Sequence, residues 1–294
     1  MLQPYMETIG VLLLAVAGVW AGLRAARARR PLWIAAYLVP LLLITAIAVS
    51  RCFDGLEFVA PFRWIMADRR EFALLAFLCT SVLVIPLSKL PHRRQRGLVW
   101  AFMVLAVTVY SVLPFLLPAL NYSYLRNMKT FVDVDGVCLQ NNNYDCGPAA
   151  AVTALRHLGI SAEEGELAIL AHTTSAAGTP ADSLCAAIRQ RYYADDVRCE
   201  YRCFRSVGEL RGLEPVIATV KYGFLVDHYV TVLNVTGTTV TVGDPLEGLK
   251  TLTHAEFDAK WRHSGIIVGV CGHLRTAPVP RRNPPENATT AAAS

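Results

Sequence analysis

One cysteine of this chain stands where a thiolate would be stabilised. Cys146 lies in the run Asp145-Cys146-Gly147-Pro148, which predicts the start of a helix because Pro148 fits the first turn without loss of a hydrogen bond. Unpaired N–H groups and the macrodipole at a helix start favour an anion. A thiolate there is a nucleophile, although a single cysteine at such a position is also typical of a small buried hydrophobe. Six residues earlier, Gln140 carries an amide that can donate to the oxygen of a tetrahedral intermediate.

A nucleophilic cysteine needs a base, and a predicted hairpin supplies a candidate. Residues 228–235 and 238–243 are β-branched runs that are joined by a tight turn at Thr236-Gly237. If the turn centres near Thr236, His228 lies opposite Asp244, with the two Cβ atoms ~5 Å apart. A carboxylate at that distance holds the imidazole tautomer and stabilises its charged form. The spacing therefore predicts a cysteine, histidine and aspartate that act together.

These residues carry a resemblance to a known family. The motifs agree in order and spacing: Gln140, then Tyr144-Asp145-Cys146-Gly147-Pro148-Ala149-Ala150, Gly178-Thr179-Pro180, His228-Tyr229-Val230 and Asp244-Pro245-Leu246-Glu247-Gly248. Over about residues 136–270 the chain resembles the bacteriocin-processing, double-glycine leader peptidases, family thirty-nine of the cysteine peptidases, which have a papain-like fold. The resemblance implies Cys146 as nucleophile, His228 as general base and acid, Asp244 as orienting carboxylate and Gln140 in the oxyanion hole. It also implies hydrolysis of peptide bonds, with leader peptides that have small residues at the cleavage site as one substrate class.

The order of segments departs from that family. Many members have the peptidase first, six membrane spans next and an ATPase last, whereas here four apolar segments come first and no ATPase follows. Residues 243–251 (GDPLEGLKT) superficially resemble a phosphate loop, but Leu249 separates the second glycine from Lys250. We therefore expect no ATP and no other cofactor. A transporter as a membrane partner is left open.

Composition divides the chain into two halves. Of its 294 residues, 54% are hydrophobic and 17% are charged, with a mean hydropathy of +0.38. Residues 1–120 hold 12 Lys and Arg against 5 Asp and Glu, and residues 121–294 hold 16 against 18. Because the basic residues of the first half lie between apolar segments, the charge excludes a nucleic-acid-binding domain. The hydrophobic content excludes a chain that is mainly disordered.

The apolar segments of the first half predict a membrane domain. Four apolar runs lie within residues 1–120, at about 8–23, 32–50, 72–90 and 98–120. A helix of 19 residues covers ~28 Å, close to the hydrocarbon thickness of a bilayer, and only the first run is short of that length. Buried core helices of a soluble domain are the alternative, but the runs have almost no polar face. We expect four transmembrane helices that anchor the protein.

The second half reads as α+β. A polar connector (121–135) leads into helices and then an antiparallel sheet, as expected for a papain-like cysteine peptidase domain at 136–274. Helices are expected at about 146–158, 163–172, 181–192 and 253–261, and strands at 197–204, 215–221, 228–235, 238–243 and 265–271. The Pro-, Ala- and Thr-rich segment 275–294 is expected to be a disordered tail.

Arginine-rich loops predict the orientation in a plasma membrane. The loop after the first span holds Arg24, Arg27, Arg29 and Arg30, and the loop after the third holds Lys89, Arg93, Arg94 and Arg96. Neither loop contains an acidic residue, so both are expected on the cytoplasmic side. Four crossings then place the peptidase domain outside the cytoplasm; if the short first run does not cross, the domain moves inside.

The eight cysteines do not form a metal site by their spacing, since no paired CxxC or HExxH occurs. Cys199 and Cys203 on one strand are ~13 Å apart, too far to bridge each other. A disulfide would join one of them to Cys138, Cys185 or Cys271. Two other functions stay open beside the thiol endopeptidase: a non-catalytic peptide-binding module, and a papain-like amidase that acts on cell-wall peptides.

Overall fold

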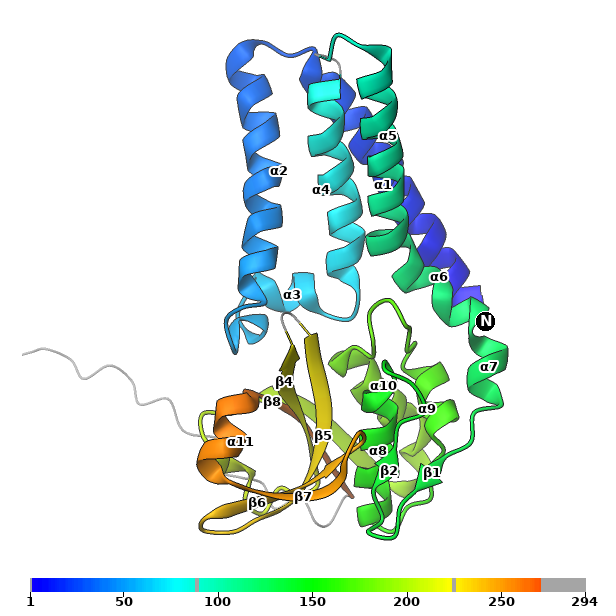
Figure 1. The fold of residues 1–294 in the computed structure, drawn as a ribbon, viewed down its shortest axis with the longest axis vertical. Coiled ribbons are helices and arrows are strands. Elements are labelled where there is room, and N and C mark those ends of the chain that lie inside the picture. The colour runs from blue at the N-terminus through cyan, green and yellow to red at the C-terminus, as the bar shows by residue number, and fades with distance from the viewer. Residues whose placement is uncertain (1, 88–89, 224–225, 271–294) are drawn as a thin grey trace, which may run out of the picture.

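The structure is a computed structural model that describes residues 2–87, 90–223 and 226–270. Long helices form an upper part, and a domain of helices and strands lies below them (Figure 1). The predicted tail at 275–294, together with Cys271 and Lys89, lies outside the described residues.

Among the described residues, four helical stretches are long and apolar enough to cross a membrane. They are α1 (Leu2–Ala26), α2 (Arg30–Ser50), α4 (Arg70–Leu87), and a fourth made of α5 (Arg93–Val107), a π-helical turn η2 (Thr108–Val112) and α6 (Leu113–Leu120). The first extends well beyond the predicted run 8–23 at both ends. Its 25 residues cover roughly 37 Å, so α1 is not shorter than a bilayer requires.

Close packing of α1 on α4 depends on small residues. Gly18 and Gly22 face α4, where the Ser81 hydroxyl donates to the carbonyl oxygen of Gly18 at 3.2 Å. A Cβ atom added at Gly18 would overlap Thr80 and the backbone of Phe77. Small residues permit such an approach between apolar helices, where van der Waals contact supplies the attraction.

Short elements lie between the spans and the lower domain. The loop between α2 and α4 contains a 3₁₀ turn, η1 (Leu56–Phe58), and a short helix, α3 (Phe62–Met66). The expected polar connector contains helix α7 (Tyr122–Arg126) and strand β1 (Phe131–Val132), which pairs with β2 (Cys138–Leu139). The connector is therefore structured, since its backbone finds partners in the domain that follows.

The lower domain confirms the predicted α+β class. Helices α8 (Cys146–His157), α9 (Glu164–Leu170) and α10 (Ala181–Arg191) precede a six-stranded sheet. Its strands are β3 (Val197–Cys203), β4 (Val216–Gly223), β5 (Val226–Val235), β6 (Thr239–Asp244), β7 (Gly248–Thr253) and β8 (Trp261–Val270). They pair antiparallel in the order β3-β8-β4-β5-β6-β7. Strand β7 was not predicted, because Lys250 and three threonine or glycine positions obscure its alternation.

The sheet has a hydrophobic core on each face. Ile217 and Ile266 pack with the buried residues of α8 and α10, whereas their neighbours Val216 and Ile267 pack on the side of α11 (His254–Lys260). This alternation follows from the two-residue period of a strand. Two short 3₁₀ turns, η3 (Tyr193–Asp195) and η4 (Val207–Leu210), complete the domain.

The predicted register of the β5–β6 hairpin is wrong by two to three residues. The turn centres between Gly237 and Thr238, where the N–H of Thr236 donates to the Thr239 carbonyl oxygen at 2.9 Å. A β-bulge between Val232 and Asn234 then changes the register once more. A prediction that centred the turn near Thr236 and assumed no bulge could not reproduce this pairing.

The predicted pair nevertheless stays on one face of the sheet. Thr231 pairs with Gly243, and continuing that register places Asp244 beside Val230. His228 lies two residues from Val230 and points to the same side of the strand. The relation between His228 and Asp244 is therefore diagonal, a geometry that long side chains still bridge.

Gly18→Ala should destabilise the helix bundle, because its added methyl group overlaps α4. We expect a loss of about 1–3 kcal/mol, the usual cost of overpacking a core, measured as a lower unfolding temperature of the full chain in detergent. The matched control is Gly10→Ala on the same helix, where the added carbon has no described atom within 4 Å apart from the adjacent backbone of α1 itself. Equal stability of the two variants would contradict the close α1–α4 contact.

Candidate active site

Cys146 is the first residue of α8, as the sequence predicted, and its side chain is largely buried. Asp145 precedes the helix as its N-cap residue. Gly147 is required by space, since a Cβ there would contact the Thr179 side chain at 2.9 Å. The chain from Thr179 thus lies directly against the start of α8, which explains why two distant motifs occur together.

His228 lies on β5 with its ring buried, and its Nε2 atom is 2.8 Å from Oδ1 of Asp244. Burial alone would lower the pKa of this imidazole. The hydrogen bond to Asp244 and the interaction with the Cys146 side chain outweigh burial and raise the pKa to about 9. Because Nε2 faces Asp244, Nδ1 is the ring nitrogen left for the Cys146 thiol. The structure therefore brings the predicted cysteine, histidine and aspartate together.

Asp244 ends β6 and is held on several sides. Its Oδ1 accepts from the backbone N–H of Leu246 at 2.9 Å, and the Lys250 ammonium lies 3.8 Å from Oδ2. Burial raises the pKa of the carboxyl group, but the partners around it, His228 first, lower the pKa overall. Asp244 is therefore an anion placed to hold the charged form of the imidazole.

Gln140 joins this group through its backbone. Its N–H donates to the carbonyl oxygen of Pro245 at 3.0 Å, next to Asp244. The side-chain Nε2 donates to the Asn142 carbonyl oxygen at 2.7 Å, and Oε1 is buried with no hydrogen-bond partner among the described residues. An amide nitrogen has two N–H groups, so one donor of Gln140 is accounted for by Asn142 and the other is not.

A second polar group, close to Cys146, was not predicted. Asp145 accepts from the backbone and the side chain of Asn142, at 2.9 and 2.8 Å. Glu164 on α9 accepts from the Asn141 side chain at 2.7 Å and interacts with Asp145. The only signal in the sequence was the pair Asn141-Asn142 close to Cys146, because the contact with Glu164 depends on how α9 packs.

Burial dominates the electrostatics of this second group. It raises the pKa of Glu164 to about 8, with the charge of Asp145 as the next cause. Burial likewise raises the pKa of Asp145. Glu164 is therefore protonated near neutral pH, so that its O–H can donate to the Asp145 carboxylate that begins α8.

A cavity of about 730 Å³ opens beside Cys146. From the lower domain it is lined by Tyr144, Cys146, Thr179 and Tyr229, among others. The Tyr229 hydroxyl donates to the Thr179 carbonyl oxygen at 3.2 Å, which joins β5 to the segment before α10. The thiol thus lines a space large enough for several residues of a peptide chain.

The remaining predictions concern the cysteines, a metal site and the segment that resembles a phosphate loop. All seven described cysteines are free thiols, and Cys185 on α10 lies within hydrogen-bonding range of Cys199 on β3. Within the described ranges, no group of three His, Cys, Asp or Glu side chains could hold a metal ion. Residues 243–251 turn from β6 into β7, whereas a phosphate loop leads from a strand into a helix.

The fold and the site define an α+β domain of the papain-like class, in which a cysteine at a helix start faces a histidine on the sheet. Comparison with known proteins gives the family: residues 136–270 match the Peptidase C39 family, and the chain belongs to it through this domain. The predicted family is thereby confirmed.

Two proteins of Methanothermobacter species are similar in sequence. An uncharacterized protein of Methanothermobacter marburgensis is 37% identical over 122 residues, which is 42% of this chain and 80% of the relative. An uncharacterized protein of Methanothermobacter thermautotrophicus is 31% identical over 141 residues, which is 48% of this chain and 93% of the relative.

Two solved structures are similar in fold. The peptidase domain of Streptococcus ComA, a bifunctional ABC transporter, has a TM-score of 0.40 and 20% identity, covering 49% of this chain and 100% of that one. A double glycine motif protease from an AMS/PCAT transporter, solved with a leader peptide, has a TM-score of 0.39 and 17% identity. It covers 49% of this chain and 96% of the other.

The buried Glu164 predicts a loss of stability in alkaline solution. A carboxyl group whose pKa is raised by folding stabilises the folded state fully below its ordinary value of 4.5, and this contribution is lost as the pH rises through about 8. Through Glu164, the unfolding temperature of the wild type should therefore fall between about pH 5 and pH 8, whereas His228 adds a fall of its own above about pH 6.5. Glu164→Gln keeps a donor toward Asp145 without a titration and should flatten the dependence below about pH 6.5.

The neighbouring Glu163→Gln is the matched control, because Glu163 is exposed and its carboxylate accepts only from the Thr130 hydroxyl, at 2.6 Å, among the described residues. Its stability profile should follow the wild type. The same slope in Glu164→Gln as in the wild type would overturn the buried, protonated state.

Proposed function

We propose that the protein is a membrane-anchored cysteine endopeptidase, with Cys146 as nucleophile, His228 as general base and acid, and Asp244 as orienting carboxylate. One observation carries the proposal: the His228 side chain interacts on one side with Asp244 and on the other with Cys146 at the start of α8. Because both neighbours raise the pKa of the imidazole, a proton transferred from the thiol is retained on the ring.

The reaction begins when the Cys146 sulfur attacks the carbonyl carbon of the scissile peptide bond. The electron pair of the C=O bond moves onto oxygen, and the tetrahedral intermediate then expels the amine, which takes its proton from His228. This leaves a thioester between Cys146 and the acyl part of the substrate. Water, deprotonated by His228, attacks the thioester, releases the carboxylic acid and restores the thiol.

Stabilisation of the oxyanion is assigned to two donors. The N–H of Cys146 belongs to the first turn of α8, whose N–H groups have no partner within the helix. The second donor is the N–H of the Gln140 amide that Asn142 does not take. This role for Gln140 is part of the proposal and rests on its motif.

Peptides are the proposed substrates, and leader peptides with small residues at the cleavage site are the finer proposal, as in bacteriocin processing. The motif resemblance supports this finer statement, together with the membership in the Peptidase C39 family. A cell-wall peptide amidase often orients its base with a second histidine, whereas here Asp244 occupies that place. A non-catalytic binding module would have no need of the paired His228 and Cys146.

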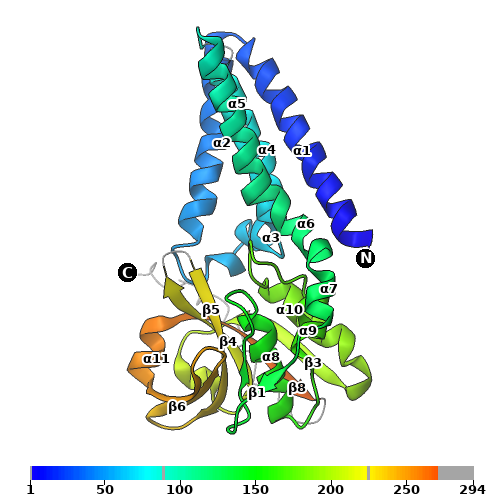
Figure 2. The same cartoon turned by 45° about the vertical axis from the view of Figure 1, so that its right-hand side comes forward.

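The peptidase domain is proposed to lie outside the cytoplasm of a plasma-membrane protein. The ends of the bundle formed by residues 24–30 and by the start of α5 are far from the lower domain, as both views show (Figures 1 and 2). These ends carry the two arginine-rich loops without acidic residues. Positive charge in short loops favours the cytoplasm, so the opposite end, with the peptidase domain, faces outward.

Cys146→Ala should abolish cleavage in a peptide library that is incubated with the full-length protein and read by mass spectrometry. The change removes one sulfur and should leave the unfolding temperature nearly unchanged. Cys203→Ala on β3 is the matched control, because Cys203 is an exposed thiol that does not line the cavity.

Variants of His228 and Asp244 should lower the cleavage rate to different extents in the same assay. His228→Ala should lose about 10²–10⁴-fold in rate, because it deletes the proton acceptor. Asp244→Asn should lose less, because the imidazole remains. Undiminished cleavage by Cys146→Ala would refute the proposed function.

Fusions to the C-terminus should report the outward orientation. Alkaline phosphatase folds actively only outside the cytoplasm and should be active there, whereas green fluorescent protein at the same point should be dark. A fusion after Arg94, at the start of α5, should give the opposite pattern and is the internal control. Fluorescence at the C-terminus without phosphatase activity would mean a cytoplasmic domain.

A further inference from the structure

The cavity that contains Cys146 is formed by both halves of the protein. Besides the residues of the lower domain, its lining includes the loop between α2 and α4, with Arg51, Asp54 and Glu57, and side chains of the spans themselves. The membrane half therefore builds part of the site, which an anchor alone would not require.

Most span residues in the lining are apolar and lie on α2 and α4, with Tyr110 of the fourth span and Glu71, which is ion-paired with Arg51, beside them. Ile44, Ile47 and Ala48 come from α2, and Phe72 and Leu75 come from α4. Ser50 ends α2 six residues after Ile44, and Arg70 begins α4 five residues before Leu75. At 1.5 Å per residue, the cavity reaches roughly 7–9 Å along the spans. Its upper end therefore lies beside the apolar part of the bundle rather than in the polar loop.

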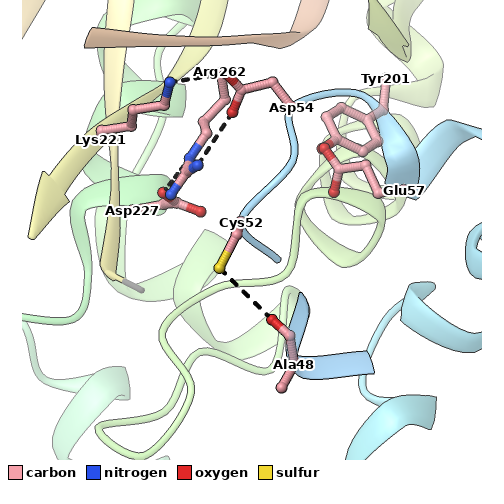
Figure 3. A network of polar contacts seen from close by, with 8 residues as sticks. All are labelled: Ala48, Cys52, Asp54, Glu57, Tyr201, Lys221, Asp227 and Arg262. Atoms are coloured by element: carbon pink, nitrogen blue, oxygen red, sulfur yellow. Dashed lines mark hydrogen bonds and ion pairs between the residues drawn. The ribbon is translucent and has the colours of Figure 1, made fainter. Parts of the chain in front are cut away.

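Ion pairs hold the loop between α2 and α4 onto the sheet (Figure 3). Arg262 on β8 lies between two carboxylates, 3.1 Å from Oδ1 of Asp54 in the loop and 2.8 Å from Oδ1 of Asp227 on β5. Lys221 on β4 is 2.7 Å from Oδ2 of Asp54, so Lys221 and Arg262 share the Asp54 carboxylate. Arg262 and Lys221 are partly shielded from solvent and share one carboxylate. Together they hold the loop in place more firmly than an isolated surface ion pair would.

A second anchor lies a few residues further along the loop. The hydroxyl of Tyr201 on β3 donates to Oε1 of Glu57 at 2.7 Å, and the Phe58 ring lies 4.9 Å from that of Tyr201. Ser183 on α10 donates to Asp68 at 3.0 Å, where the loop returns to α4. With both ends and the middle of the loop fixed, the apolar groove between α2 and α4 stays continuous with the space at Cys146.

We propose that this groove receives a membrane-inserted apolar segment of the substrate, so that the bond cleaved at Cys146 lies directly beside that segment. The inference rests on the proposed peptidase function and adds the substrate class: polypeptides held in the bilayer by an apolar stretch. A segment that already lies in the bilayer leaves no water on entering the groove, so shape-matched van der Waals contact with side chains such as Ile44 and Leu75 supplies the attraction. A soluble peptide that enters only from the aqueous side would leave this surface unused.

Two thiol reagents distinguish the routes to Cys146. One is N-ethylmaleimide, and the other is a maleimide carried on the end of a leucine–alanine helix of about 20 residues, which inserts in a bilayer. Both are reacted with the full-length protein in lipid nanodiscs, and modification of Cys146 is followed by peptide mass spectrometry. The wild type should react with both.

Ala48→Trp fills the groove from an exposed position of α2, whereas Ala46→Trp on the same helix points away from the cavity and is the matched control. Ala48→Trp should slow the helix-bound maleimide at Cys146 by about tenfold or more and should leave N-ethylmaleimide within about twofold. Ala46→Trp should change neither rate. Leu75→Trp, on the facing helix, should repeat the effect of Ala48→Trp.

The other outcomes distinguish a wrong substrate route from a wrong nucleophile. Unchanged rates of the helix-bound reagent in both Ala48→Trp and Leu75→Trp, or equal slowing of the two reagents, would overturn the groove as the substrate route while Cys146 remained reactive. Failure of Cys146 to react with either reagent in the wild type would instead remove the nucleophile, and with it the proposed function.

Discussion

The site depends on the close approach of one helix to the middle of a sheet. The face of α8 that meets the sheet consists largely of alanines, and Ala149, Ala150 and Ala154 have no exposed surface. The hydroxyl of Thr231 on β5 donates to the Ala150 carbonyl oxygen at 2.7 Å, which fixes the helix against the strand that carries His228. Side chains larger than alanine would move α8 outward, and the first residue of the helix would no longer reach the imidazole. The catalytic geometry that we propose is thus a consequence of packing distance.

Local signals were sufficient for much of this fold. The helix at Cys146 was predicted to run to about Leu158 and ends at His157, with Gly159 following at a φ of 78° that favours glycine. The four apolar segments and five of the six main strands were likewise evident from periodicity. What the sequence did not reveal depends on pairing: the bulge after Val232, strand β7, and the partners of the connector at 121–135.

The polar environment of the site was only partly predictable. His228 and Asp244 were paired on a register that is incorrect, and they meet because both lie on the same face of neighbouring strands. Glu164 and Asn141 come together only through the packing of α9, which no local pattern encodes. The loop between α2 and α4 showed balanced charges and no preferred side, and its carboxylate Asp54 pairs with residues more than 160 positions away.

The central claim is that Cys146, His228 and Asp244 form one interacting group, and titration of the His228 ring tests it most directly. Nuclear magnetic resonance of ¹⁵N-histidine-labelled full-length protein, with His228→Gln used to assign the signal, gives the pKa of this imidazole. The account predicts a value of about 9, which falls in both Asp244→Asn and Cys146→Ala because each removes an interaction that raises it. A wild-type imidazole that titrates near the ordinary value of 6.5 and does not respond to either change would contradict the account.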